Sequence, residues 1–426
     1  MGIRTPALLA LLGVLATVAY TPSLSLPFIS DDYVQIDLGR QFGPVSGWSA
    51  LAGDVLYRAR ATSLVLTYWT ERAFGLNALA FNSSSLLLHV LNTWLVLALG
   101  LWRPIGWRVA AVAAASFAVQ HAHQEAVIWY SALPELLVFF FSVSSFLLWV
   151  LWLQDRDRKP ALYAGSMACF LLALLSKESA VVVVGLLAMT LAIERVEWRK
   201  RVWWLVPYAA IAAVYAGLIF TARESHLHFN DAGTFALDAP FWSVLARSTG
   251  RLLWFWGLVS LIALAAWRER RSALLLAVAG AWMAITFLPY SFLTYMPFVP
   301  SRHTYWASVG RALIIAAGVL AFSAHYRKRW ATALLALVIV AHNYGYLWLR
   351  KRPQFVERAR PTEMLVDFAR RVDGPIYLHC FPYGREVAEL ALEVRLNRQL
   401  EPAPTPSPDP ARVFCWFHGA KPPPMI

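Results

Sequence analysis

The feature that most constrains this sequence is a succession of apolar segments about as long as a membrane is thick. A helix needs about 20 apolar residues to cross the hydrocarbon core, and lipid offers no partner to an unpaired backbone group. Apolar residues make up 59% of the 426 residues and charged residues only 15%, against about 25% charged residues in soluble domains. We therefore predict an all-α polytopic membrane protein with about eleven transmembrane helices. The segments begin near Pro6, Ser84, Trp107, Leu133, Ala161, Ala180, Val202, Ser243, Ala273, Ala307 and Trp330.

The basic residues predict which loops face the cytoplasm. The net charge is +13, and arginine and lysine gather in alternate loops, such as those holding Arg103 and Arg327. By the positive-inside rule this places the N-terminus in the cytoplasm and the C-terminus outside. The location we expect is a bacterial inner (plasma) membrane, with the C-terminus in the periplasm. The clustering between apolar segments argues against nucleic-acid binding. The first segment also fits a signal peptide cleaved near Ala19, and in both interpretations the residues after Pro27 lie outside.

One apolar stretch, 161–193, is interrupted by Ser176-Lys177-Glu178-Ser179. Treated as one span, it would reverse the charge bias of every later loop. Treated as a tight hairpin of two short spans, it leaves each later loop with its expected sign. We therefore predict the hairpin.

The chain changes character near residue 350, where charge rises and long apolar segments stop. We predict a membrane domain over 1–349, with a long outside loop at 21–82, and a small extracytoplasmic α/β domain over 350–426. The parts expected in the second domain are a helix around Met364–Phe368, a strand at Ile376–Phe381, a helix at Val387–Val394, a Pro-rich linker at 402–410 and a strand at Val413–Phe417. Cys380 and Cys415 both fall in this domain, either as a disulfide or as two buried thiols.

Two adjacent carboxylates, Asp31 and Asp32, follow directly after the first apolar segment. Charged groups close to lipid are costly, so their presence points to a function. The alternative is structural, because aspartate is a good N-cap for a short helix lying along the interface.

The next outside loop contains His121, His123 and Glu125 in an H-x-H-x-E arrangement. Imidazole and carboxylate groups are zinc ligands, but the H-E-x-x-H spacing of zinc proteases is absent. We therefore favour a role in acceptor binding or in a polar network over a metal site. The histidine pair leaves a divalent metal as the alternative.

Isolated cations occur in two later outside loops. Arg302 suits an outward-facing phosphate, because guanidinium binds phosphate oxygens in a two-pronged manner. Its alternative role is to reach lipid headgroups at a helix end. Lys177 lies at the hairpin tip, where it either meets a phosphate or pairs with Glu178.

The order of these motifs resembles the GT-C glycosyltransferases, and in particular bacterial relatives of the transmembrane and tetratricopeptide-repeat O-mannosyltransferases, without the repeats. The resemblance covers roughly residues 5–325. The matching pieces are Ser30-Asp31-Asp32-Tyr33, Tyr57-Arg58, Leu87-Leu88-His89-Val90-Leu91-Asn92, His123-Gln124-Glu125-Ala126-Val127, Leu175-Ser176-Lys177-Glu178 and Arg302-His303-Thr304-Tyr305 with Ser308-Val309-Gly310.

The resemblance implies an inverting transfer of a sugar from a polyprenyl-phosphate donor to an acceptor hydroxyl on a protein, lipid or glycan. The transfer is expected at the extracytoplasmic face of the membrane, in contact with membrane lipids. The resemblance implies a base, Asp32 or Asp31, with Glu125 orienting the acceptor or supporting the base. The residues implied for the donor phosphate are Arg302, Arg58 and Lys177. Those implied for the acceptor or a polar network are His121, His123, Tyr57, His303 and Tyr305. Because the implied leaving group is already a lipid phosphate, the resemblance also implies no obligatory metal.

Two other functions compete with this one. A transporter or lipid flippase would carry charges near the bilayer midplane and an internal repeat, and the sequence shows no repeat. An inactive relative acting as a partner-binding membrane protein would have no need of the carboxylates and Arg302, which the chain keeps.

Overall fold

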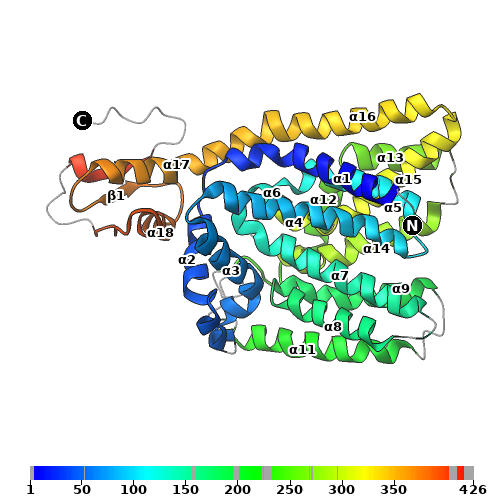
Figure 1. Ribbon diagram of the computed structural model, residues 1–426, viewed down its shortest axis with the longest axis horizontal. Helices are drawn as coiled ribbons and strands as arrows, with labels where there is room; N and C mark the ends of the chain where they lie inside the picture. The colour runs from blue at the N-terminus through cyan, green and yellow to red at the C-terminus, as the bar shows by residue number, and fades with distance from the viewer. Residues whose placement is uncertain are drawn as a thin grey trace.

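The computed structural model describes residues 4–51, 53–155, 157, 159–194, 201–222, 224, 233–267, 269, 272–294, 296–402 and 410–416. A long helical body carries a small appendage at one end, and the N-terminus lies at the opposite end (Figure 1). We call the end of the body that meets the appendage the appendage end.

Each predicted apolar segment contains a helix of the body. Among the described residues, seven helices are long and apolar enough to cross a membrane, or eight if the bent pair α12–α13 is one span. The protein is therefore an integral, multi-pass membrane protein of the predicted all-α class. The helices are α1 (Arg4–Tyr20), α4 (Ala78–Ala98), α5 (Gly106–Ala118), α7 (Leu133–Gln154), α8 (Pro160–Leu174), α9 (Val183–Glu194), α11 (Val206–Thr221), α12 (Phe241–Leu253), α13 (Trp256–Ala266), α14 (Ala273–Phe287), α15 (Ser308–Tyr326) and α16 (Arg329–Gly345).

The stretch 161–193 is divided as the charge bias predicted. Helix α8 ends at Leu174, and a 3-10 turn, Glu178–Val182, leads into α9. The tip is held by Ser176, whose hydroxyl accepts a hydrogen bond from Thr62 at 2.7 Å. The interruption is therefore a break between two short helices.

Helix α15 lies in the centre of the body, and small residues let its neighbours approach closely. A Cβ atom at Gly310 would lie 2.5 Å from the carbonyl oxygen of Ala279, on α14. A Cβ atom at Gly318 would lie 2.7 Å from the side chain of Ser260, on α13. Because lipid provides little hydrophobic driving force between helices, such close backbone packing is what holds membrane helices together.

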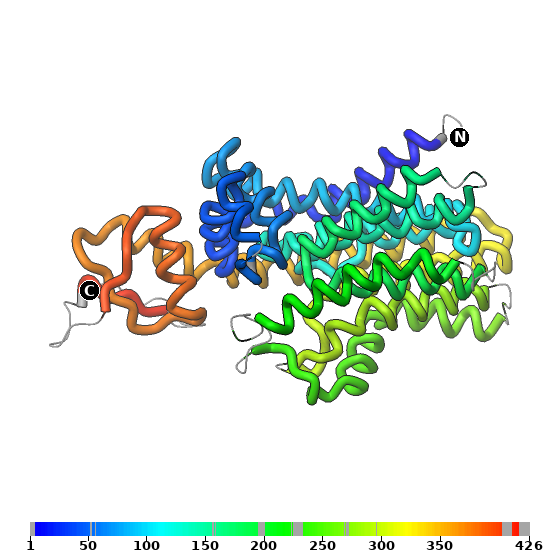
Figure 2. Tube along the Cα trace, turned by 90° about the horizontal axis from the view of Figure 1, so that it is seen from below, coloured from blue at the N-terminus to red at the C-terminus, as the bar shows by residue number. Residues whose placement is uncertain are grey.

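The loop 21–82 is helical, and its helices α2 (Asp32–Phe42) and α3 (Val55–Phe74) lie at the appendage end (Figures 1 and 2). Gly39 permits their contact, since a Cβ atom there would lie 2.9 Å from Thr67. The hydroxyl of Tyr33 donates a hydrogen bond to Glu363, at 3.1 Å, and so ties α2 to the helix that leads into the appendage.

A continuous helix connects the body to the appendage. Helix α16, a π-helical turn (Tyr346–Lys351) and α17 (Arg352–Arg371) follow one another without a break, so the helix passes through the predicted boundary at residue 350. That boundary remains a prediction. Beyond α17, the appendage contains β1 (Tyr377–Cys380), α18 (Arg385–Leu396) and β2 (Val413–Cys415), and the two strands pair in parallel.

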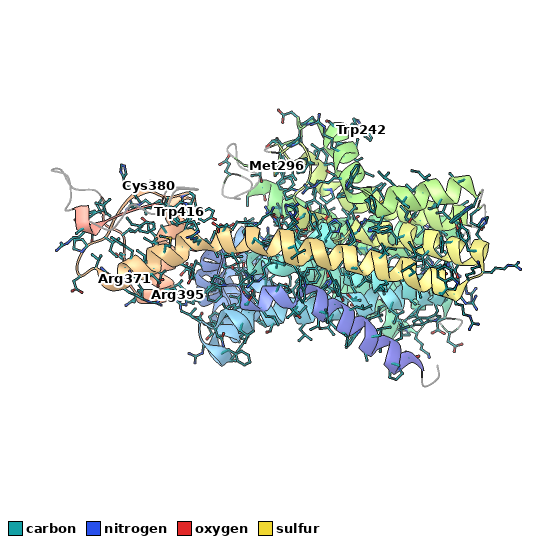
Figure 3. The ribbon with its side chains drawn as sticks, turned by 90° about the horizontal axis from the view of Figure 1, so that it is seen from above. Trp242, Met296, Arg371, Cys380, Arg395 and Trp416 are labelled. Atoms are coloured by element: carbon teal, nitrogen blue, oxygen red, sulfur yellow. A yellow bond between two sulfur atoms is a disulfide. The ribbon has the colours of Figure 1, made fainter. Side chains whose placement is uncertain are left out.

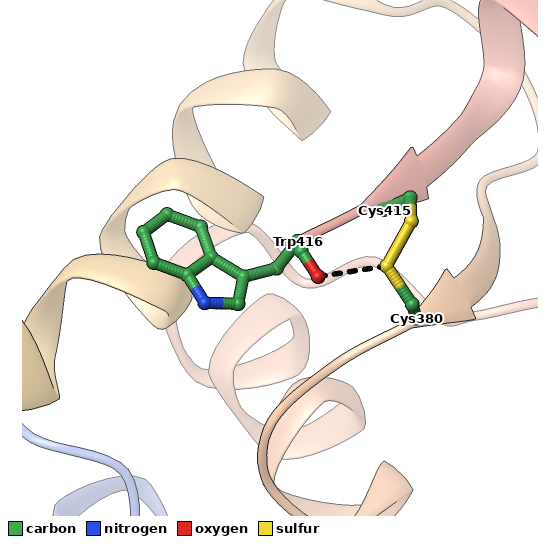
Figure 4. Close-up of a disulfide and its surroundings, with 3 residues drawn as sticks. All are labelled: Cys380, Cys415 and Trp416. Atoms are coloured by element: carbon green, nitrogen blue, oxygen red, sulfur yellow. Dashed lines mark hydrogen bonds between the residues drawn. A yellow bond between two sulfur atoms is a disulfide. The ribbon is translucent and has the colours of Figure 1, made fainter. Parts of the chain in front are cut away.

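The appendage strands are joined by a disulfide between Cys380 and Cys415 (Figure 4). Of the two alternatives left open by the sequence, the pair of free thiols is therefore wrong. The predicted strand at Val413–Phe417 is shorter in the structure. Residue 417 and residues 403–409 of the predicted Pro-rich linker lie outside the described part of the chain.

We expect the disulfide to stabilise the appendage. The two cysteines are 35 residues apart, and closing a loop of that length is worth about 4 kcal/mol in the chain-entropy model. The Cys415→Ser variant should lose hydrogen-exchange protection in β1 and β2, with α7 unchanged. The matched control is Cys169→Ser, which removes a cysteine that is free. Equal protection in the two variants would contradict this role.

Candidate active site

The two adjacent aspartates differ in environment. Asp31 is exposed, whereas Asp32 is only 2% exposed. The Asp32 carboxylate accepts hydrogen bonds from the backbone N–H of Ile29 (2.7 Å) and from both the N–H (2.7 Å) and the hydroxyl (2.9 Å) of Ser131. The chain enters this pair through Ser30, whose φ of 40° is unusual for a residue other than glycine. Asp32 thus fixes the turn that presents Asp31.

Burial raises the pKa of Asp32 from 3.8 to about 7. The hydrogen bonds from Ile29 and Ser131 oppose this rise, because they stabilise the charged form of the carboxylate, and burial outweighs them. Asp32 therefore titrates close to neutral pH.

A second group surrounds the indole of Trp129, and we call it the Trp129 cluster (Trp129, Glu125, Arg302 and Arg358). The guanidinium groups of Arg302 and Arg358 lie 5.1 and 4.4 Å from the centre of the Trp129 ring. Arg358 also donates to Glu125 at 3.2 Å, and the backbone N–H of Arg302 donates to Glu125 at 3.3 Å. The indole N–H donates to the carbonyl of Ile29 at 3.3 Å, so the cluster touches the turn that carries the aspartates.

The charge of Glu125 is set by its arginine neighbours. Burial by itself would raise the pKa of this carboxyl group, but Arg302 and Arg358 bring the pKa below its ordinary value. Glu125 is therefore ionised, and it balances part of the positive charge of the cluster.

A third group is a buried ionic network around Glu135. Lys177, from the hairpin tip, and His303 both contact one oxygen of Glu135, and the hydroxyl of Tyr290 donates to the other oxygen at 2.9 Å. The expected alternative pairing of Lys177 with Glu178 is wrong, because Glu178 pairs with Arg60 at 2.6 Å. Burial, followed by the charge of Lys177, lowers the pKa of His303 to about 3, so this imidazole is neutral.

The network borders an apolar cavity of about 710 Å³. Glu178, Ser179, Tyr215 and Tyr290 form its polar end. Asp238 also lines it, and the rest is mainly aliphatic and aromatic side chains of α11 and of residues 233–237 and 288–292. Arg60 adjoins this end through Glu178. Most of the cavity wall is therefore apolar, and its polar end lies against the ionic network of Glu135.

The remaining predicted residues are dispersed. The two histidines diverge: His121 contacts Asn343, on α16, at 2.6 Å, while the fully buried His123 contacts Ser308 at 2.9 Å. Tyr305 is buried, and its hydroxyl contacts His89 at 2.8 Å. Hence His123 and Tyr305 belong to an internal polar network.

Two predicted residues lie on α3. Tyr57 packs against Phe42, with ring centres 5.5 Å apart, and Arg58 is buried beside it. Tyr57 therefore belongs to the packing of α3 against the end of α2.

The structure provides no ligand set for the metal alternative. Within the described ranges, no three His, Cys, Asp or Glu side chains come close enough to hold a metal ion. The absence of an obligatory metal remains a prediction.

Asp32, Glu125 and Arg302 are connected by a chain of contacts. Asp32 binds Ser131, two residues after Trp129, whose ring meets Arg302. Ser131 is in turn four residues before Glu135, about one helical turn. Four residues of these groups were not predicted from the sequence: Glu135, Arg60, Trp129 and Arg358. Glu135 had a signal, since a carboxylate at the start of an apolar segment must have a partner.

The fold is similar to that of solved glycosyltransferases. No protein-family model matches the chain, and no curated protein sequence does. The archaeal oligosaccharyltransferase AglB from Archaeoglobus fulgidus, solved with an inhibitory peptide and a dolichol-phosphate, matches 93% of this chain and 64% of its own, with 11% identity and a TM-score of 0.56. The likeness shows the GT-C-like fold that the sequence resemblance implied.

Two structures of ArnT from Cupriavidus metallidurans are similar in the same way. The apo form has 15% identity and a TM-score of 0.55, and covers 93% of this chain and 86% of ArnT. The form bound to undecaprenyl phosphate has a TM-score of 0.54, again with 15% identity, and covers 91% of this chain and 85% of ArnT.

The pKa of Asp32 predicts how stability depends on pH. Between pH 4 and 7 the folded protein keeps a proton on Asp32 that the unfolded chain releases, so this contribution to stability falls as pH rises, by up to about 4 kcal/mol. Asparagine does not titrate. The stability of the wild type relative to Asp32→Asn, measured by thermal unfolding, should therefore be greater at pH 5 than at pH 8. A difference that does not change between pH 5 and pH 8 would show that Asp32 is already ionised at pH 5 in the folded protein.

Proposed function

We propose that this protein transfers a sugar from a polyprenyl-phosphate donor to an acceptor hydroxyl, with inversion at the anomeric carbon. One observation carries the proposal: an exposed carboxylate, a cationic cluster and an apolar cavity beside an ionic network are connected. The hydrogen bond from Trp129 to Ile29 connects the first two, and Tyr290 and Glu135 connect the cavity to His303, the residue after Arg302. A lipid-phosphate donor needs an apolar volume for its tail and cations for its phosphate, and an acceptor hydroxyl needs a base.

The donor fits the apolar cavity. Its volume of about 710 Å³ receives the part of the prenyl chain nearest the phosphate, and its polar end leads toward Lys177 and Arg60. Arg302, one residue before the neutral His303, supplies a further guanidinium to the departing phosphate, and Arg58 is the next candidate for this role. The ArnT structure with undecaprenyl phosphate supports this type of donor.

Asp31 is the better base of the two aspartates. Its carboxylate is exposed, whereas the Asp32 carboxylate is occupied by Ile29 and Ser131. In the reaction, the acceptor hydroxyl gives its proton to Asp31 and its oxygen bonds the anomeric carbon. The bond from that carbon to the phosphate oxygen breaks at the same time, and the prenyl phosphate leaves with the electron pair. Asp32 positions the turn, and Glu125 keeps the Trp129 cluster in place.

The appendage end is the extracytoplasmic end in this proposal. The N-terminus lies at the other end (Figure 1), and the positive-inside rule assigns the N-terminus to the cytoplasm. The appendage disulfide fits an oxidising compartment such as the bacterial periplasm. The acceptor approaches beside the appendage, where Arg358 and Tyr383 border a cavity of about 630 Å³. This acceptor is a protein, a lipid or a glycan.

The base assignment predicts the effect of Asp31→Asn. Removing a general base should lower turnover roughly 100-fold or more, measured as release of prenyl phosphate from a panel of polyprenyl-phosphate sugars by the protein in nanodiscs. The matched control is Asp37→Asn, on α2, the helix that begins one residue after Asp31, and it should retain activity. Full activity of Asp31→Asn would reject this base.

The donor assignment predicts that a bulky side chain in the apolar cavity blocks the prenyl tail. Ala216 lines the cavity, while Ala213 is exposed on the same helix, α11, and does not line it. Ala216→Trp should raise the KM for a long-chain donor about tenfold and change the KM for a short-chain analogue little. The control Ala213→Trp should behave as the wild type. Equal effects of the two variants would place the tail elsewhere.

A further inference from the structure

A buried arginine on α15 has no role in the proposed transfer. Arg311 is one turn inside the helix and is only 1% exposed. No carboxylate within the described ranges forms an ion pair with it, and its Nε atom is buried without a hydrogen-bond partner. A buried charge without compensation costs several kcal/mol, so the fold keeps Arg311 at a considerable cost in stability.

Arg311 lines a cavity of about 320 Å³ that is rich in positive charge. Arg251 and Lys351 also line it, and none of its lining residues is an aspartate or glutamate. Arg251 stacks on Phe298 at 4.3 Å, and Lys351 donates to Gln354 at 3.0 Å, so neither pairs with a carboxylate there. Three cations without an anion constitute an electrostatic site for one.

The cavity lies beside the break between α12 and α13. These helices meet at 83°, and Gly250, Leu252 and Trp254 of this corner form one wall. Trp254 is 68% exposed, and Trp242, which projects from the edge of the body in Figure 3, is 77% exposed. Exposed tryptophans near the ends of membrane helices are typical of the level of the lipid headgroups.

We propose that this cavity binds the phosphate headgroup of an anionic lipid. Arg311 contacts the phosphate from the buried side, and Arg251 and Lys351 hold it from the outer side, while the corner of α12 and α13 packs against the lipid chains. The site shares no lining residue with the apolar cavity assigned to the donor. It holds a second lipid, and it does not depend on transferase activity.

The loops of the candidate active site reach this second site. Gln124 and Thr304 line the cavity, and they are the chain neighbours of Glu125 and His303. Thr304 also donates a hydrogen bond to the carbonyl of Ala122 at 3.0 Å, which joins the two loops. A bound phosphate therefore stabilises both loops together.

The test compares binding of phosphatidic acid and phosphatidylcholine to the purified protein by native mass spectrometry. We expect the wild type to prefer phosphatidic acid. Arg311→Gln should weaken that binding about tenfold or more, as expected for the loss of charged hydrogen bonds. Because Arg311→Gln also changes the interior, the double variant Arg251→Gln/Lys351→Gln repeats the test from the outer side.

The matched control is Arg247→Gln. Arg247 is exposed on α12, one turn before Arg251, and does not line the cavity, so its substitution should leave lipid binding unchanged. Wild-type affinity of the double variant for phosphatidic acid would overturn the proposal. If the wild type shows no lipid preference, but inorganic phosphate raises its melting temperature and fails to do so in the double variant, the ligand is a soluble anion and the lipid assignment is wrong.

Discussion

The ionic network around Glu135 is the interaction on which the appendage end depends. A carboxylate at the start of a membrane helix is tolerated only with a partner, because the low dielectric strongly disfavours an isolated charge. Lys177 and His303 meet that requirement from segments 42 and 168 residues away. Pairing of this one charge therefore brings α7, the α8–α9 hairpin and the loop before α15 to one place.

The same region fixes the aspartate turn. Ser131, one helical turn before Glu135, donates twice to Asp32, and the Trp129 side chain reaches the carbonyl of Ile29. The segment 129–135 thus carries the buried Glu135 and also holds the turn that contains Asp31 and Asp32. Adjacent aspartates acquire different environments in this way, since one is used to anchor the turn and the other is left exposed.

Much of the fold follows from the sequence because the membrane restricts the alternatives. Lipid admits only helices with satisfied backbones, so apolar length alone located the segments from α1 to α16. The charge bias divided 161–193 into two helices, as the break before Glu178 confirms. The site was less predictable, because the partners of Lys177 and His121 lie far away in the chain and adjacent residues face different neighbours.

The sequence by itself determined the class of protein, the membrane segments and a set of polar motifs whose order resembles that of GT-C glycosyltransferases. Only the tertiary structure decided which of these residues meet. In the structure Asp32 is buried and Asp31 is exposed, and Lys177 pairs with Glu135. His121 and His123 have different partners, Asn343 and Ser308. The reason is that hydrophobicity acts along a segment and can be summed from its composition. The pairing of charges depends on which helix ends become neighbours, and helix packing sets that.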